Sequence, residues 1–247
     1  MPQVSSQDSS SFQEENIASD KETQSDVTTV SDFIKRASQL RGLVFGNGLD
    51  VLLEGGLLPK TLTFLYGENS DRMMNILCGN SIHLFGGRVI FIDAANSFDP
   101  YLIVRQCVKE KSASGSKELL RSIIISRAFT CYQLHNLLTS EIEKLLQQEE
   151  EIKSIFVSGI GSVFNEQDNT AEEIERLQFL MASALRDFAS AGENSVQFVV
   201  ASSKTRSEQF ITKCNTAIKL LAGEKLSDNG RAILMKHHVR QFAMANL

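Results

Sequence analysis

Residues 67–74 have the length and setting of a phosphate-binding loop but lack its reactive side chains. The motif G-x-x-x-x-G-K-[ST] follows a strand, opens a helix, and holds phosphates through backbone N–H groups, a lysine and a hydroxyl that binds Mg²⁺. Gly67 stands at the first glycine, whereas the second glycine, the lysine and the hydroxyl fall on Arg72, Met73 and Met74. A thioether carries no charge to offset phosphate. This stretch therefore has the frame of a nucleotide site without the groups that make one work.

The residues between the two glycine positions also oppose phosphate binding. They are Glu68, Asn69, Ser70 and Asp71. The two carboxylates place negative charge in a loop meant for an anion, and Arg72 adds a Cβ where the backbone can need unusual φ. One alternative is that Arg72 substitutes for the lysine one position early, which leaves Mg²⁺ without ligands. Met73 and Met74 have a plainer explanation, in which they begin the apolar face of the helix and fill the empty phosphate site.

Strands and helices alternate along the chain from residue 61 onward. Apolar runs predict strands over 61–66, 88–93, 122–126, 155–157 and 196–201, and periodicity predicts helices over 71–85, 99–111, 131–149 and 170–190. The segments 216–221 and 231–235 predict a closing β-hairpin. This rhythm indicates an α/β fold with a mainly parallel twisted sheet and helices on both faces. Ligands of such sheets lie at the carboxyl ends of the strands.

Composition divides the 247-residue chain into a polar tail and one domain. Residues 1–30 are rich in Ser, Gln, Glu, Asp and Thr, which predicts a disordered acidic tail. A linker helix is expected within 31–45, and the core domain over 46–247. The net charge of −5 argues against a surface coated for nucleic acid. Without a long apolar run or an apolar leader, we expect an intracellular protein with no membrane contact. Its four scattered cysteines are expected to be reduced and to hold no metal.

Four stretches of the chain follow patterns that occur together in one protein family. Residues 45–67 resemble T-G-x-x-x-L-D-x-L-L-x-G-G-x-x-x-G-x-h-T-x-h-x-G, where h is apolar, and Phe91-Ile-Asp-Ala-Ala-Asn-Ser-Phe is similar to F-I-D-T-E-x-x-F. Ile125-Ser-Arg-Ala-Phe-Thr-Cys-Tyr-Gln resembles A-R-A-F-x-x-x-x-Q, and residues 175–189 look like the helix R-Q-x-x-L-x-x-F-L-R-x-L-x-x-L-A. These are patterns of the RecA superfamily, and the Ala-Phe stretch favours the RadA/RadB recombinases over the KaiC-like branch. The resemblance covers about residues 41–240 and implies a RecA-like P-loop core.

The resemblance also implies catalytic positions, and this chain substitutes each of them. The Walker B aspartate should follow the fourth strand, where the residue is Ser158, and the water-positioning glutamate falls on Ala95. Together with Met73 and Met74, these substitutions remove the groups that phosphoryl transfer needs. We therefore expect no ATP hydrolysis and no bound cofactor, the alternative being ATP with Mg²⁺. Asp93 remains, either as a remnant of the nucleotide site or, on at least equal grounds, as a structural cap at the end of its strand.

In recombinases of this family two loops meet DNA, here those after Ser158 and after Ala201. The first loop has no cation and two carboxylates, which is unfavourable beside a phosphate backbone. The second holds the candidate DNA contacts Lys204, Arg206, Phe210 and Lys213. Phe210 is a candidate for stacking on a base, or it is tucked back into the core.

Two other segments are candidate partner contacts. Lys236, His237 and Arg240 follow the last strand, where related ATPases reach the nucleotide of a neighbouring subunit; the alternative is a polar strand end. Phe33 and Ala37 resemble the Phe-x-x-Ala segment that joins recombinase filaments, but they lie one residue too far apart. Assembly of this chain with itself is therefore in doubt, while docking on a partner stays open.

The resemblance and the lost positions together predict a non-catalytic paralogue of the recombinases. It would assist an active RecA-type recombinase, or another paralogue, in homologous recombination and DNA repair, with single-stranded DNA as a further candidate partner. A second hypothesis is a recombinase-like, DNA-dependent ATPase with an altered P-loop. A third is a regulatory scaffold unrelated to DNA.

Overall fold

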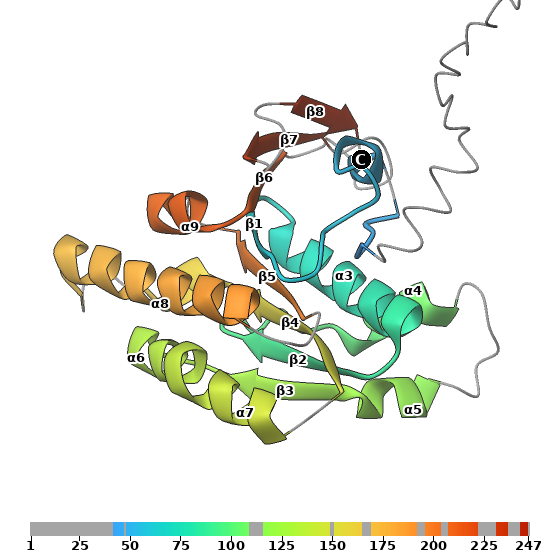
Figure 1. Ribbon diagram of the computed structural model, residues 1–247, viewed down its shortest axis with the longest axis horizontal. Coiled ribbons are helices and arrows are strands. Elements are labelled where there is room, and N and C mark those ends of the chain that lie inside the picture. The colour runs from blue at the N-terminus through green and yellow to red at the C-terminus, as the bar shows by residue number, and fades with distance from the viewer. Residues whose placement is uncertain are drawn as a thin grey trace, which may run out of the picture.

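The computed structural model describes residues 42–46, 48–108, 116–148, 151–164, 169–191, 196–203, 207–221, 231–236 and 243–246. They form one twisted sheet of eight strands flanked by helices (Figure 1), with the strand order β3-β2-β4-β5-β1-β6-β7-β8. The strands are β1 Leu62–Gly67, β2 Arg88–Asp93, β3 Ile123–Arg127, β4 Ile152–Ser158, β5 Gln197–Ser202, β6 Thr216–Leu221, β7 Arg231–Lys236 and β8 Ala243–Asn246.

Helices connect most of the strands. They are α2 Leu49–Leu52, α3 Ser70–Phe85, α4 Pro100–Val108, α5 Ser116–Arg121, α6 Cys131–Asn136, the π-helical turn η2 Leu137–Glu141, α7 Ile142–Gln148, the 3₁₀ turn η3 Ile160–Val163, α8 Ala171–Ala191 and α9 Glu208–Lys213. The elements α6, η2 and α7 follow one another without a break and make the single helix predicted over 131–149.

The sheet is parallel from β3 to β6, and β7 and β8 extend it with antiparallel pairing. This confirms the α/β fold, the mainly parallel sheet and the closing hairpin. Strand β1 is central, because it pairs with β5 on one side and with β6 on the other. The carboxyl ends of the parallel strands meet along one edge of the sheet. Ser158 lies at this edge, and so do residues 67–74, which we call the substituted loop.

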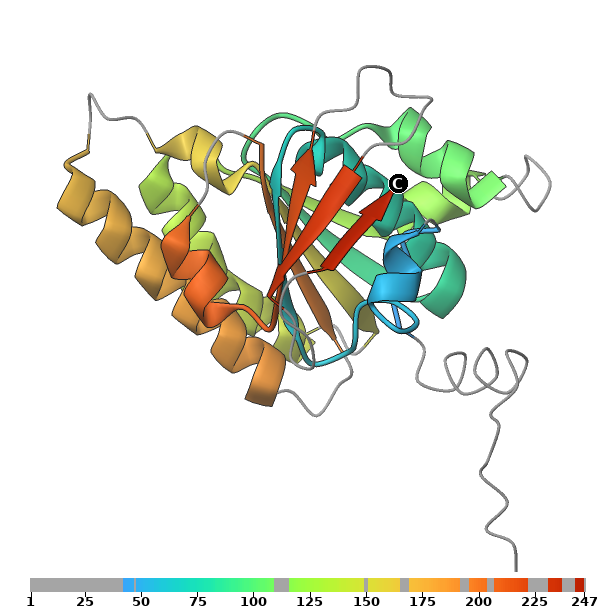
Figure 2. The same cartoon turned by 90° about the horizontal axis from the view of Figure 1, so that it is seen from above.

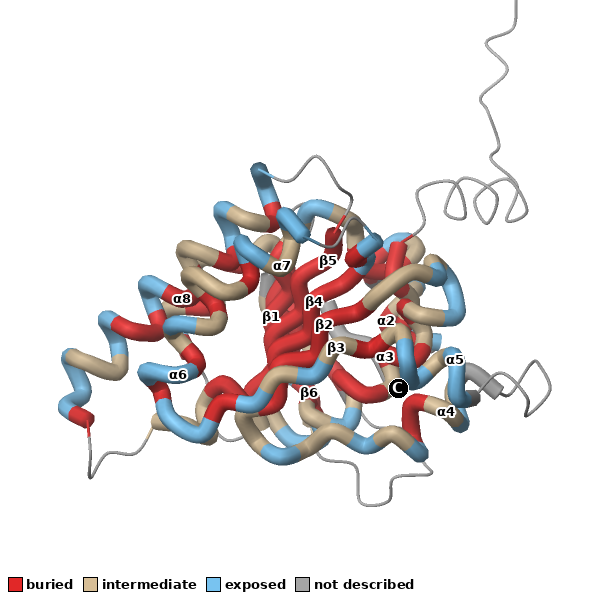
Figure 3. Tube along the Cα trace, turned by 90° about the horizontal axis from the view of Figure 1, so that it is seen from below, coloured by how far each residue is buried: buried red, intermediate tan, exposed pale blue. Residues whose placement is uncertain are grey.

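Helices cover both faces of the sheet (Figure 2), with α2 to α5 on one side and α6 to α9 on the other. Each side has its own hydrophobic core, one built around Leu65, Met74 and Phe91 and one around Phe64, Met181 and Phe210. Figure 3 shows the consequence as a buried sheet between helices whose outer faces are exposed. Near-continuous apolar strands such as Leu62–Tyr66 follow from this double cover.

The structure corrects the predicted boundaries at three places. Leu43 and Phe45, placed in a linker by sequence, are buried in the core, and Leu43 bridges to Leu57, so the core includes residues 42–45. Helix α5 was not predicted, and α9 occupies part of a segment predicted as loop. The predicted tail 1–30 and the helix within 31–41 lie outside the described residues.

Three cysteines, Cys78, Cys131 and Cys214, are buried thiols, while the side chain of Cys107 lies outside the described residues. Across the described part of the chain, no three His, Cys, Asp or Glu side chains gather as a metal site would need. Within the same residues, no helix has the length and apolar character needed to cross a membrane.

Candidate functional site

The joint between β1 and α3 is shorter than a phosphate-binding loop of the predicted length. Strand β1 ends at Gly67 and α3 begins at Ser70, so Glu68 and Asn69 alone join them. Asn69 adopts the left-handed conformation with φ of 63°, and its carbonyl accepts the N–H of Met73 at 2.9 Å. Residues 70–74, which the motif would place in and after the loop, are all helical. The backbone thus forms a tight strand-to-helix turn here.

Gly67 has a structural reason to be glycine that involves no nucleotide. Its φ is +104°, in the region that favours glycine, and a Cβ built on it would lie 2.2 Å from the carbonyl oxygen of Leu220 in the neighbouring strand β6. Only a residue without a side chain allows β1 and β6 to approach this closely. The presence of the first motif glycine therefore follows from sheet packing alone.

The first turns of α3 direct their apolar side chains into the core. Met74 is fully buried and Met73 packs partly buried against the same cluster, in agreement with their predicted place on the apolar face. Ser70 is also fully buried, and its hydroxyl has no hydrogen-bond partner among the described residues. Arg72 is exposed and points instead into a pocket between α3 and α4.

A chain of hydrogen bonds joins α3 to the ends of β4 and β2. The Ser158 hydroxyl, at the end of β4, donates to Asp71 Oδ1 at 2.8 Å. The hydroxyls of Ser158 and Ser97 lie 2.6 Å apart. Because the proton of Ser158 is used toward Asp71, Ser97 is the donor in this second bond. The residue at the Walker B position is thus bonded to a carboxylate of the substituted loop.

Asp93 caps the turn after its strand, which is one of the two roles that the sequence left open. Its carboxylate accepts the backbone N–H of Ser97 at 2.9 Å and of Phe98 at 3.2 Å, which holds the turn after β2. Asn75, buried in α3, ties this turn to the helix by donating to the carbonyls of Asp71 and Ser97 and accepting the N–H of Asp99. The polar groups around this edge of the sheet are therefore largely occupied by one another.

Ala95 and Ser158 lie close together at the carboxyl edge of the sheet. Strand pairing sets Asp93 opposite Ser158, and a Cβ built on Gly159 would lie 2.2 Å from the Ala95 Cβ. Ala95 lines a pocket of about 430 Å³ whose walls also include Asp71, Arg127 and Phe129.

The candidate DNA residues are only partly described. Phe210 is fully buried and stacks on Phe64, with ring centroids 5.4 Å apart. Of its two predicted places, the one in the core is confirmed and the base-stacking role is wrong. The start of α9 at Glu208 turns this ring toward the sheet. Lys213 holds its ammonium 4.4 Å from the ring centroid of Phe179 on α8. Lys204 and Arg206 lie outside the described residues.

The candidate partner residues are mostly outside the described part of the chain. These are Phe33, Ala37, His237 and Arg240, together with the side chain of Lys236, whose backbone ends β7.

Two features of this edge were not found from sequence. Ser97 completes the hydrogen-bond chain although no motif marks it. Tyr132 on α6 donates its hydroxyl to Glu173 on α8, and this hydrogen bond, assisted by burial and by the negative charge, raises the pKa of Tyr132 above 10.0. Both contacts join segments distant in sequence, so neither periodicity nor spacing carries a signal for them.

The parallel sheet, with a strand-to-helix turn after its central strand and catalytic-type positions at its carboxyl edge, defines a RecA-type α/β core. Comparison with known proteins identifies the family within this class. The Rad51 family model matches residues 36–238, so the chain belongs to that family. It is similar to the meiotic recombination protein DMC1 homolog A of Oryza sativa subsp. indica and to DMC1 homolog B of subsp. japonica. Each is 29% identical over 160 residues, covering 62% of this chain and 45% of the relative. The matched region thus spans less than half the length of these relatives.

Proposed function

We propose that this chain is a recombinase paralogue without ATPase activity, which assists an active RecA-type recombinase in homologous recombination and DNA repair. Membership of the Rad51 family supports a role in recombination and repair. The substitutions at positions 73, 74, 95 and 158 support the lack of catalysis. The partner is an active recombinase or another paralogue, and single-stranded DNA is a further candidate ligand.

The hydrogen bond between Ser158 and Asp71 carries the non-catalytic part of the proposal. It occupies the space between the Walker B position and the substituted loop, where the resemblance puts Mg²⁺ and phosphate. A phosphate oxygen about 4 Å from the Asp71 carboxylate would meet a repulsion of about 4 kcal/mol per pair of charges near a protein surface. No lysine is present at position 73 to offset it.

The open edge of the sheet at β3 supports the partner-binding part. Among the residues that the structure describes, β3 pairs with β2 alone, so its outer backbone groups are open to an added strand. Ile125 is 44% exposed on this edge, and Phe129 just after it is 74% exposed. An extended segment of a partner can pair with β3 and place apolar side chains against these two residues.

Titration with a fluorescent ATP analogue and Mg²⁺, together with an ATPase assay with and without single-stranded DNA, tests the lack of catalysis. The expected result is neither micromolar magnesium-dependent binding nor turnover above a protein-free blank. Micromolar binding with turnover would favour the second hypothesis, an altered but working ATPase.

A pull-down with a purified recombinase from the same organism tests the partner. Ile125→Glu is expected to abolish capture by placing a charge on the β3 edge. Val51→Glu is the matched control, because Val51 is 79% exposed on α2, on another part of the surface. If the recombinase is not captured and no single-stranded DNA binds across a salt series, the scaffold hypothesis takes the place of this one.

A further inference from the structure

A pocket of about 530 Å³ between α3 and α4 carries two arginines and an exposed tyrosine. Its walls include Arg72 and Asn75 from α3, and Tyr101 and Arg105 from α4. Tyr101 is 86% exposed, which is far above the usual value for an aromatic side chain in a folded domain. Tyrosine and arginine are the residue types that most often anchor a bound protein segment.

Neither arginine forms an ion pair with any residue that the structure describes, and both side chains are exposed. Arg72 lies in the first turn of α3, where a cation opposes the helix dipole and an acidic residue would be favourable. Arg72 therefore slightly lowers the stability of α3, and an anion bound beside Arg72 would restore this stability. Arg105, in the last turn of α4, suits its own helix and faces the same pocket.

The one carboxylate that lines this pocket among the described residues is already engaged. Asp99 Oδ1 accepts the N–H of Leu102 at 3.0 Å and so caps the start of α4. Its charge partly offsets the arginines, but the amino ends of α3 and α4 both add positive potential to this region. The pocket is thus suited to an acidic peptide segment, whose carboxylates can pair with the arginines and whose other side chains can cover Tyr101.

The amino-terminal part of the chain is attached close to this pocket. The described core begins at Gly42, and the nearby Val44 carbonyl accepts the Asn80 Nδ2 at 2.9 Å. Asn80 follows Arg72 on α3 by eight residues, a distance of about 12 Å along the helix. Residues 31–41 could span roughly 35 Å when extended, so residues 1–30 can reach the pocket.

Residues 1–30 contain six carboxylates and one lysine, so their charge is opposite to that of the pocket. We propose that this acidic segment docks, within the same chain, on the pocket formed by Arg72, Tyr101 and Arg105. Tethering raises the local concentration of the segment to about the millimolar range, which suffices for a weak charge-assisted contact. The docked segment covers the surface beside the substituted loop, and phosphorylation of its serines or threonines would strengthen the contact.

A tryptophan placed in the pocket can report on this docking, because the chain has no other tryptophan. In full-length Tyr101→Trp protein at low salt, the docked segment covers the tryptophan, so a small acrylamide quenching constant is expected. Combining this change with E14Q, E15Q, D20N and E22Q is expected to raise the quenching constant several-fold. The same rise is expected with R72E and R105E, and at 1 M NaCl, where the Debye length falls to about 3 Å.

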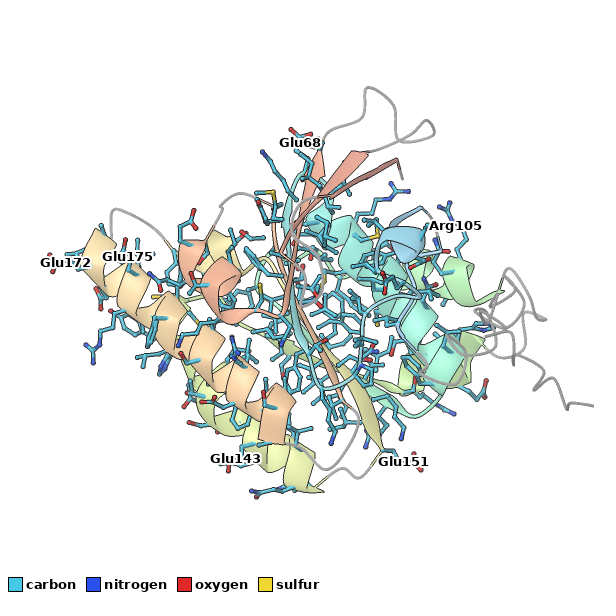
Figure 4. The ribbon with its side chains drawn as sticks, turned by 45° about the horizontal axis from the view of Figure 1, so that its top comes forward. Glu68, Arg105, Glu143, Glu151, Glu172 and Glu175 are labelled. Carbon is cyan, nitrogen blue, oxygen red and sulfur yellow. The ribbon has the colours of Figure 1, made fainter. Side chains whose placement is uncertain are left out.

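The matched control removes four carboxylates elsewhere, with E143Q, E151Q, E172Q and E175Q. These glutamates lie on other parts of the surface, well away from Arg105 (Figure 4), and their removal is expected to leave quenching unchanged. Combining R72E and R105E with lysines at positions 14, 15, 20 and 22 is expected to restore slow quenching. Equal quenching with the native and the neutralised segment overturns the proposal. Protection that depends on protein concentration also overturns it, because the segment would then come from a second copy.

Discussion

Replacing Ser158 by aspartate would restore the Walker B residue type and place a second carboxyl beside Asp71. Ser158 is fully buried, and its hydroxyl is 2.8 Å from Asp71 Oδ1. A carboxylate at this position would approach Asp71 to about 3.5 Å, which gives a repulsion of roughly 5 kcal/mol at an effective dielectric constant of 20. We expect S158D to destabilise the fold and not to restore ATP hydrolysis.

Protonation limits this cost. Raising the pKa of the introduced carboxyl from about 3.9 to about 7 costs roughly 4 kcal/mol at neutral pH, at about 1.36 kcal/mol per unit. The expected loss of unfolding free energy at pH 7.5 is therefore about 4 kcal/mol. A carboxyl whose pKa is higher in the folded than in the unfolded state binds more protons when folded, so its presence lowers stability as pH rises. The penalty of S158D is thus small near pH 4 and grows up to about pH 7.

Urea unfolding of wild type and S158D at pH 5 and pH 7.5 measures this difference. Adding Asp71→Asn removes the opposing charge and is expected to recover most of the loss. S154D is the matched control, because Ser154 is equally buried on β4 but bonds to the Ser81 hydroxyl, so Asp71→Asn should not rescue it. If S158D is as stable as wild type, or if Asp71→Asn rescues both variants equally, the contact between Asp71 and Ser158 is refuted.

Three further substitutions test the packing around the site. G67A is expected to cost at least about 2 kcal/mol of unfolding free energy, through backbone strain and the clash with Leu220. G46A is the control and should cost less, because Gly46 has φ of +78° but open space around it. Equal losses for the two variants would contradict the close approach of β1 to β6. F210A should cost about 3–5 kcal/mol in thermal or urea unfolding, against less than about 1 for F179A, and a stable F210A would return this ring to the surface. E173A removes both the hydrogen-bond acceptor and the negative charge that raise the Tyr132 pKa. Spectrophotometric titration, with Y132F as the reference, should then show this tyrosine ionising at lower pH; an unchanged titration would exclude the hydrogen bond.

Periodicity predicted the strands well because both faces of the sheet are covered. Continuous apolar runs such as Leu62–Tyr66 have few other stable arrangements in a chain of alternating strands and helices. Short helices were harder to predict from the sequence than strands. The six-residue helices α5 and α9 bury few side chains, and their polar segments are equally typical of loops. For this reason the sequence left the place of Phe210 open between the surface and the core, since the start of a short helix decides which way its residues face.

The sequence names positions for the substituted site, but it could not give the contacts that these residues make. Ala95 and Ser158 could be located because each follows an apolar strand in a motif of fixed spacing. The bond from Ser158 to Asp71 depends on α3 beginning at Ser70, one residue before the predicted start, and on two segments 87 residues apart. Helix boundaries are the least certain part of any prediction from sequence, and one residue of helix rotates the next side chain by about 100°.

The central place of β1 in the sheet bears on how the chain folds during synthesis. Strand β1 pairs with β5 and β6, which are made long after it, whereas β2 pairs with β3 and β4, which follow it more closely. Contacts between distant segments slow folding, because the intervening loop must be closed before they form. The β2–β3–β4 part can therefore assemble first on the ribosome, while β1 waits with both edges unpaired until β5 emerges, and with one edge unpaired until β6 emerges. During this interval β1 is an aggregation-prone apolar strand, and chaperone binding to it would be most valuable.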